Sequence, residues 1–171
     1  MLRCSNLVAI ALAGFLANCC VLAAQTAPPG YKLHLWTRDA SAIVNQGQPL
    51  VIMVSLKNVS SQLINVEEDK SLSGDANYKL SVLDINGKEP PLTAYHRLLR
   101  GKPDPKDPMM ILNSDSILVP LGPGGTLTNP IDLSKLYSLK PGQYTVQARR
   151  EYDSQGDSVA SDSLTVTITS R

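Results

Sequence analysis

A Pro-Gly turn that leads into an alternating strand, in residues 139–146, constrains the fold of this chain more than any other segment. Proline presets φ for a turn, and glycine takes backbone angles that other residues resist, so the chain reverses at Pro141 and Gly142. From Tyr144 onward, apolar and polar residues alternate. This period of two predicts a strand with one buried and one solvated face.

The same segment resembles the tyrosine corner of immunoglobulin-like and fibronectin type III-like sandwiches. Leu139, Gly142 and Tyr144 match the positions of that structural corner, and Val146 stands where an immunoglobulin domain has its second cysteine. The resemblance implies an all-β fold, a single immunoglobulin-like antiparallel β-sandwich. It implies no activity, because this sandwich hosts many unrelated functions.

The rest of the chain repeats short alternating segments separated by turn residues, which is an all-β pattern. We expect seven or eight strands in one domain, residues 31–171. Besides the strand after Gly142, the expected strands lie around residues 31–36, 50–56, 63–66, 78–82, 117–121, 126–133 and 164–168. The strand at 50–56 is expected to be central and covered on both sides.

Two turns and one short helix are expected between these strands. Asn86-Gly87 predicts a tight hairpin in which both central residues have positive φ. Its partner strand should be brief, because Pro90 and Pro91 interrupt it. A helical turn is expected at residues 94–99, and an acidic turn at residues 67–69.

The N-terminus reads as a signal peptide. Arg3 precedes an apolar run from Leu7 to Leu16, which is too short for a membrane span, and small residues follow at Ala23 and Ala24. We expect cleavage after residue 24, a flexible leader at residues 25–30, and secretion or release into the periplasm. An uncleaved N-terminal anchor and a lipid anchor at Cys19 are the alternatives.

Charge and cysteine content narrow the class of partner. Cys4, Cys19 and Cys20 are the three cysteines, so removal of residues 1–24 leaves no disulfide. Arg3 is the sole charged residue in that segment, which leaves the mature chain with no net charge. A neutral chain without a basic run argues against nucleic acid or an anionic membrane as partner. We expect a monomer that binds a protein.

No motif for catalysis, cofactor binding or metal binding is present in the sequence. His34 and His96 are the two histidines, and neither has metal-ligand spacing. We therefore predict no catalytic residue, no cofactor and no metal ion. A cation at residues 67–69 with Asp75 is a minor alternative to a solvated turn. His34 and Trp36 are expected to be structural, with Trp36 in the core.

The segment from Tyr95 to Met110 is the candidate partner-binding site. Its cations can donate to an acidic surface, its methionines offer adaptable apolar contact, and its prolines stiffen the loop. The candidate residues are Arg97, Arg100, Lys102, Pro103, Pro105, Lys106, Met109 and Met110. The alternative is a solvated insertion with its methionines packed against the sandwich.

These observations predict a non-catalytic, exported protein-interaction module. The alternative is a secreted proteinase inhibitor or protease-associated domain that uses the loop at residues 101–110. Residues 132–146 and 161–168 resemble the closing strands of bacterial proteinase-inhibitor sandwiches. The resemblance implies that the loop would enter a protease cleft in extended form.

Overall fold

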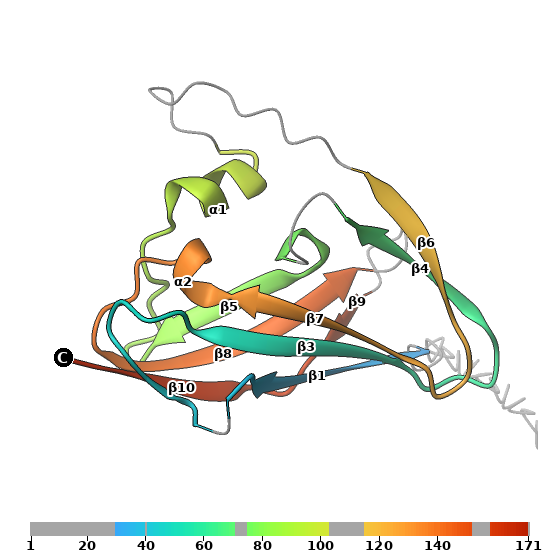
Figure 1. Cartoon of the computed structure of the whole chain (residues 1–171), viewed down its shortest axis with the longest axis horizontal. Coiled ribbons are helices and arrows are strands. Elements are labelled where there is room, and N and C mark those ends of the chain that lie inside the picture. The colour runs from blue at the N-terminus through green and yellow to red at the C-terminus, as the bar shows by residue number, and fades with distance from the viewer. Residues whose placement is uncertain (1–29, 40, 71–74, 103–114, 152–157, 171) are drawn as a thin grey trace, which may run out of the picture.

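A computed structural model describes residues 30–39, 41–70, 75–102, 115–151 and 158–170 (Figure 1). The strands in these ranges are β1 (Tyr31–Thr37), β2 (Ile43–Asn45), β3 (Val51–Asn58), β4 (Ile64–Asp69), β5 (Lys79–Asp84), β6 (Ser116–Leu121), β7 (Thr126–Asp132), β8 (Gly142–Glu151), β9 (Ser158–Ala160) and β10 (Leu164–Thr169). The helices are the 3₁₀ helix η1 (Asp75–Asn77), α1 (Ala94–Leu99) and α2 (Leu133–Leu136). The expected all-β class is confirmed. The expected signal peptide and most of the leader lie outside the described residues.

Two sheets form the layers of a β-sandwich (Figure 1). One has the strand order β1-β3-β7 and the other the order β2-β10-β8-β5, with β9 paired to β8. Neighbouring strands are antiparallel except β2, which runs parallel to β10. β3 lies between β1 and β7, so the prediction of a central strand there is confirmed.

The core lies between the two sheets and follows from the alternation in each strand. In β8, every second residue from Tyr144 to Arg150 is buried, and the residues between them are exposed. β10 supplies Val166 and Ile168 to the same core, and β3 supplies Ile52 and Val54 from the opposite sheet. Burial of branched aliphatic side chains from both layers supplies most of the stabilisation of such a sandwich.

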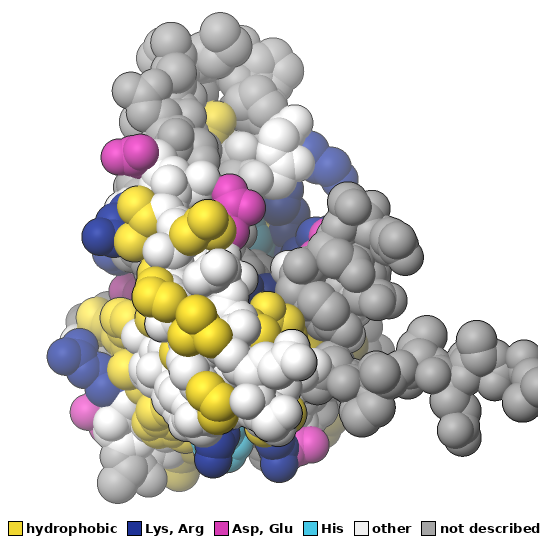
Figure 2. Space-filling model, turned by 90° about the vertical axis from the view of Figure 1, so that its right-hand side faces the viewer, with side chains coloured by type: hydrophobic (Ala, Val, Ile, Leu, Met, Phe, Trp, Pro, Cys, Tyr) yellow, Lys and Arg dark blue, Asp and Glu magenta, His cyan; other side chains and the backbone are white. Residues whose placement is uncertain are grey.

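A two-stranded ribbon, β4 paired with β6, extends to one side of the sandwich (Figure 1). Its inner face contributes Val66 and Leu121 to the core, whereas Leu63 and Leu118 are 64% and 68% exposed. Figure 2 shows hydrophobic side chains gathered along this side of the molecule. The outer face of the ribbon therefore mixes exposed polar residues of β4 with the exposed Leu118 of β6.

The Tyr144 side chain closes the turn at the start of β8. Its hydroxyl donates to the carbonyl oxygen of Lys140 at 2.9 Å and accepts from the Lys140 N–H at 3.0 Å. Gly142 has φ of +150°, an angle that favours glycine, and Leu139 packs at the margin of the core. The three residues that the sequence singled out therefore lie together at this turn.

Replacement of Tyr144 by Phe tests these two hydrogen bonds. We expect a loss of about 1–3 kcal/mol in the free energy of unfolding, because the Lys140 backbone groups lose a partner next to a buried ring. Urea unfolding measures the loss. Tyr31→Phe is a comparison at a partly buried tyrosine. A negligible change in Tyr144→Phe would show that the hydroxyl does not hold the turn.

The prediction of an acidic turn at residues 67–69 was wrong. Glu67, Glu68 and Asp69 belong to β4, and the Glu68 side chain is buried. Glu68 Oε1 lies 2.7 Å from Arg150 Nη1, and Glu68 Oε2 accepts from the side chains of Asn77 and Asn129. A carboxylate can be buried in a strand when it has a cationic partner and two amide donors. The local sequence does not reveal these partners, because they lie elsewhere in the chain.

The Asn86-Gly87 turn forms, with different backbone angles from those expected. Only Gly87 has positive φ, +73°, and its N–H donates to Asp84 O. The Asp84 carboxylate accepts from the N–H groups of Asn86 and Lys88, which accounts for this aspartate without an ion. No strand in the described chain follows the turn as its partner.

Trp36 lies on the outer face of β1, not in the core as predicted. Leu33 and Leu35 point inward, so the alternation turns His34 and Trp36 outward. The two rings stack with centroids 5.4 Å apart, and Trp36 is partly buried.

Candidate functional site

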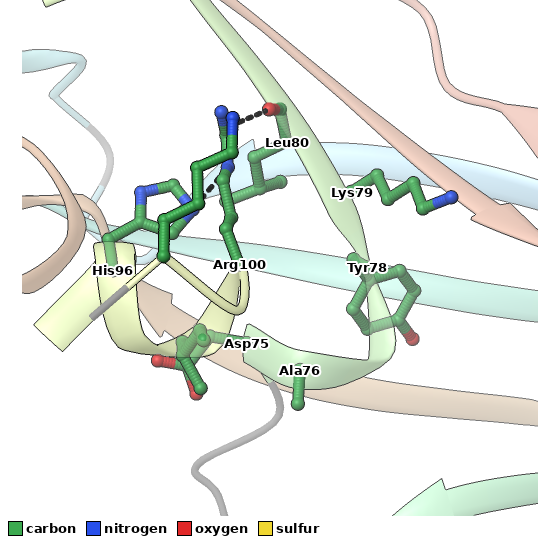
Figure 3. Close-up of a pocket in the computed structure, with 9 residues that line it drawn as sticks. Asp75, Ala76, Tyr78, Lys79, Leu80, His96 and Arg100 are labelled. Atoms are coloured by element: carbon green, nitrogen blue, oxygen red, sulfur yellow. Dashed lines mark hydrogen bonds between the residues drawn. The ribbon is translucent and has the colours of Figure 1, made fainter. Parts of the chain in front are cut away.

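The candidate site is a pocket bounded by η1, the first residues of β5, and α1 with the residues that follow it (Figure 3). Its volume is about 490 Å³. The lining residues are Asp75, Ala76, Tyr78, Lys79, Leu80, His96, Leu99, Arg100 and Lys102. Two of the candidate partner-binding residues, Arg100 and Lys102, are therefore part of one concave surface.

The helix α1 carries His96 and Arg100 into the pocket because its first turn is capped. Thr93 Oγ1 accepts from the His96 N–H at 3.2 Å and donates to Lys135 O at 2.6 Å. The first bond satisfies a helix N–H, and the second ties the cap to α2. Gly101, with φ of +64°, ends the helix, and the Lys102 N–H bonds back to Arg97 O.

Both ring nitrogens of His96 are engaged by the protein. Nδ1 lies 3.1 Å from Leu136 O, and Nε2 lies 3.2 Å from Arg100 Nε (Figure 3). Because arginine only donates, Nε2 accepts and Nδ1 carries the proton. Burial, with the Arg100 charge as a second cause, lowers the pKa of His96 below 6.5. The histidine is thus a neutral ring with a fixed tautomer.

The Arg100 guanidinium joins α1 to the sandwich. Its Nη2 donates to Leu80 O at 3.3 Å, Glu89 Oε1 at 2.9 Å and the Tyr137 hydroxyl at 3.2 Å. Tyr137 is 1% exposed, and its burial raises the pKa of the phenol to about 12, so the hydroxyl stays protonated. Among the described residues, no hydrogen bond from Arg100 Nη1 to the protein is found, and Arg100 itself lines the pocket.

Among the residues that line the pocket, cations outnumber acids, although two of the cations are paired with carboxylates just outside the lining. Lys79, Arg100 and Lys102 line it together with one acidic residue, Asp75. Figure 3 shows Arg100 beside His96, with Leu80 of β5 bonded to the arginine, and Asp75 apart from them. Lys79 is 70% exposed and pairs with Glu151, and Lys102 has no ion-pair partner in the part of the chain that is described. Lys102 is therefore the lining cation that no described carboxylate neutralises, and it could attract an anionic group.

The pKa of His96 gives a testable pH dependence of stability. The unfolded chain protonates this ring near pH 6.5, and the folded chain only at lower pH, so folding loses stability as the pH falls through that window. Its contribution is at most about 1.4 kcal/mol per pH unit. We expect urea unfolding of His96→Gln to show a shallower pH slope than the wild-type chain between about pH 7 and pH 5. Equal slopes would contradict this account, and His34→Gln is the control.

The other candidate partner-binding residues lie elsewhere. Arg97 Nη1 donates to Leu92 O, so this arginine is held against the chain before α1 and does not line the pocket. Pro103, Pro105, Lys106, Met109 and Met110 lie outside the described residues. Sequence reasoning missed Lys79, Asp75 and His96 as pocket residues. Only Lys79 carried a signal, as an exposed cation in an expected strand.

Within the described ranges, no three His, Cys, Asp or Glu side chains come together as a metal site. No helix in those ranges has the length and apolar content needed to cross a bilayer.

Comparisons with known proteins show no family for this chain. No family model and no curated protein matches the sequence. Among solved structures, the bacterial hydrophobin BslA is similar with a TM-score of 0.38 and 14% identity, over 85% of this chain and all of that one. A β-glucosidase from Listeria innocua is similar with a TM-score of 0.37 and 16% identity. That match covers 81% of this chain and 16% of the β-glucosidase.

Proposed function

We propose that this chain is an exported, non-catalytic protein-interaction module that holds an acidic segment of its partner at the pocket beside α1. The observation that carries the proposal is the bonding of His96 and Arg100. A general base needs a ring nitrogen that can reach substrate, and both nitrogens of His96 are bonded within the protein. Hydrogen bonds hold the His96 and Arg100 side chains in the wall of the pocket. Lysine side chains lie at its rim, and Arg100 Nη1 is a further donor.

An acidic side chain fits this arrangement better than an apolar one. A carboxylate that enters beside Arg100 would accept from Nη1, and the ammonium groups of Lys79 and Lys102 would lie at the rim. Arg100 needs no reorganisation for this contact, because Glu89, Tyr137 and Leu80 already hold its guanidinium. A preorganised donor lowers the entropic cost of binding.

Binding of a labelled hexaglutamate peptide tests the proposal by fluorescence anisotropy at low salt. We expect the double variant Lys79→Ser/Lys102→Ser to weaken the affinity by about fivefold or more. A tenfold change in affinity corresponds to about 1.4 kcal/mol, and each exposed charge pair contributes a fraction of that energy. The matched control is Lys32→Ser/Lys57→Ser, which removes two exposed lysines from the outer face of the other sheet. Equal weakening by both double variants would refute a specific pocket.

The proposal includes an immunoglobulin-like topology and export. The order β1-β3-β7 facing β5-β8-β10 corresponds to the A-B-E and C-F-G strands of that fold, and the Tyr144 bonds to Lys140 support it. The proposal of export is based on residues 1–24, which resemble a signal peptide. N-terminal sequencing of the protein recovered outside the cytoplasm should begin at Gln25, and a retained Met1 would contradict cleavage.

A further inference from the structure

Among the described residues, no strand pairs with the outer edge of β6, and the residues on that edge can be identified from the ladder. The Lys70 N–H bonds to Asp115 O, which makes that pair hydrogen-bonded and fixes the alternation along the ribbon. Ser116, Leu118 and Pro120 therefore point their backbone groups away from β4. No described strand pairs with them, and β6 lies at the margin of the molecule (Figure 1).

The other edge of the ribbon is closed by side chains. Glu67 O accepts from the Arg150 guanidinium, and the Asp69 N–H donates to Asn77 Oδ1. Edge strands of natural proteins are protected in this way or by charges, bulges and prolines. β6 has no charged residue, and Pro120 is its single protective feature. Pro120 is one of the residues whose backbone points away from β4. It therefore removes one N–H donor from the outer edge of β6, and the carbonyl groups of that edge can still accept.

We propose that two copies of this chain associate by antiparallel pairing of β6 with β6 about a two-fold axis at Leu118. In this register Leu118 faces Leu118 of the second copy, and Ser116 faces Pro120. Four backbone hydrogen bonds form, two between the Leu118 residues and one from each Ser116 N–H to a Pro120 carbonyl. The result is a four-stranded sheet with the order β4-β6-β6-β4.

The side chains of β6 suit a second copy of the same strand. The two Leu118 side chains, each 68% exposed in the single chain, cover one another on the outer face. On the inner face, Ile117 lies beside Val119 of the second copy, a β-branched pair of the kind that stabilises sheets. No charged residue of β6 faces another, and the net charge of the chain, +1, adds little repulsion between copies.

Other two-fold registers leave an edge residue without a partner in β6 or place prolines opposite one another. A two-fold axis at Pro120 places two residues without N–H groups opposite one another. An axis at Ser116 leaves Pro120 beyond the paired segment. Only the Leu118 axis gives all three edge residues a partner within β6. This surface contains none of the residues that line the pocket beside α1, and the dimer replaces the monomer expected from the sequence.

Sedimentation velocity on the purified full chain tests the association. We expect a concentration-dependent dimer in the wild type and a monomer at every concentration in Leu118→Lys, which places a charge on the edge. Leu63→Lys is the matched control, because Leu63 is as exposed and lies outside β6. It should keep the dimer within about twofold in affinity. A monomeric wild type, or equal loss of the dimer in both variants, overturns the pairing.

A disulfide distinguishes the register. With Cys4, Cys19 and Cys20 replaced by Ser, Leu118→Cys should form an intermolecular disulfide under mild oxidation, since facing residues in a hydrogen-bonded pair have Cα atoms about 5.5 Å apart. Ser116→Cys should not, because its symmetry mate lies four residues along the strand, about 14 Å away. Equal cross-linking of the two variants overturns the Leu118 axis.

Discussion

Replacement of Glu68 by Leu is expected to destabilise the protein by about 3–5 kcal/mol, because it leaves the Arg150 charge buried without its carboxylate. The side chains of Glu68 and Arg150 are 8% and 7% exposed, and the ion pair joins β4 to β8 at 2.7 Å. The change also removes the acceptor for Asn77 and Asn129, which adds unpaired amides in the same place.

The surroundings of this ion pair explain why the loss should be so large. The Arg150 guanidinium lies 5.1 Å from the centroid of the Tyr78 ring, and the Tyr78 hydroxyl donates to Asn129 Oδ1. Burial raises the pKa of Tyr78 to about 12, although the Arg150 charge acts in the opposite direction. Tyr78 therefore stays neutral and cannot take over the role of the missing carboxylate.

Urea unfolding measures this effect, with two comparison variants. Glu67→Leu changes an exposed residue of the same strand and should stay within about 0.5 kcal/mol of wild type. The double variant Glu68→Leu/Arg150→Met removes both charges and should recover much of the loss, since an apolar pair avoids the desolvation penalty. A Glu68→Leu variant as stable as wild type would show that the ion pair does not fasten the ribbon.

Replacement of Leu121 by Ala is expected to cost about 2–5 kcal/mol, because it opens a cavity where the ribbon joins the core. Leu121 is 6% exposed, and a Cβ on Gly125 would come within 3.1 Å of its Cδ1. Asn58 Nδ2 donates to Leu121 O at 2.8 Å, so the backbone at this point is held as well. The neighbours of Leu121 therefore have little freedom to move into the space that its side chain would leave.

Leu118→Ala is the matched control for Leu121→Ala in thermal and urea unfolding. It makes the same chemical change on the same strand, at an exposed position. We expect it to stay within about 0.5 kcal/mol of wild type when measured on the single chain at low concentration. Similar losses in both variants would contradict the assignment of one face of β6 to the core and the other to the surface.

Alternation in the sequence predicted most strands of the two sheets, but not β2 and β9, which have three residues each and are too short to show a period of two. β3, β8 and β10 could be found because one face of each is mostly apolar, with Asn58 and Arg150 as the polar exceptions at the ends of β3 and β8. The same alternation already determined the orientation of Trp36, since Leu33 and Leu35 occupy the opposite face of β1. The incorrect assignment of Trp36 to the core came from residue type, which is a weaker signal than the period of two.

The elements that sequence reasoning missed depend on distant partners. Glu68 lies in a strand because Arg150, 82 residues later, neutralises it inside the protein. The short helix α2 depends on the Asp132 cap and on packing under α1. The sequence could predict a basic segment but not the pocket, because Arg100 forms hydrogen bonds with residues 80, 89 and 137, which lie far from it in the chain.

The most direct test of the proposed function is a map of the acidic-peptide contact by two-dimensional ¹H–¹⁵N NMR. With hexaglutamate added, we expect the backbone amide shifts to concentrate at Asp75–Leu80 and Leu99–Lys102, the two segments that line the pocket beside α1. The same titration with hexalysine should leave them unchanged. Shifts spread over the exposed lysines of both sheets, or shifts confined to β4 and β6, would contradict the pocket as the binding site.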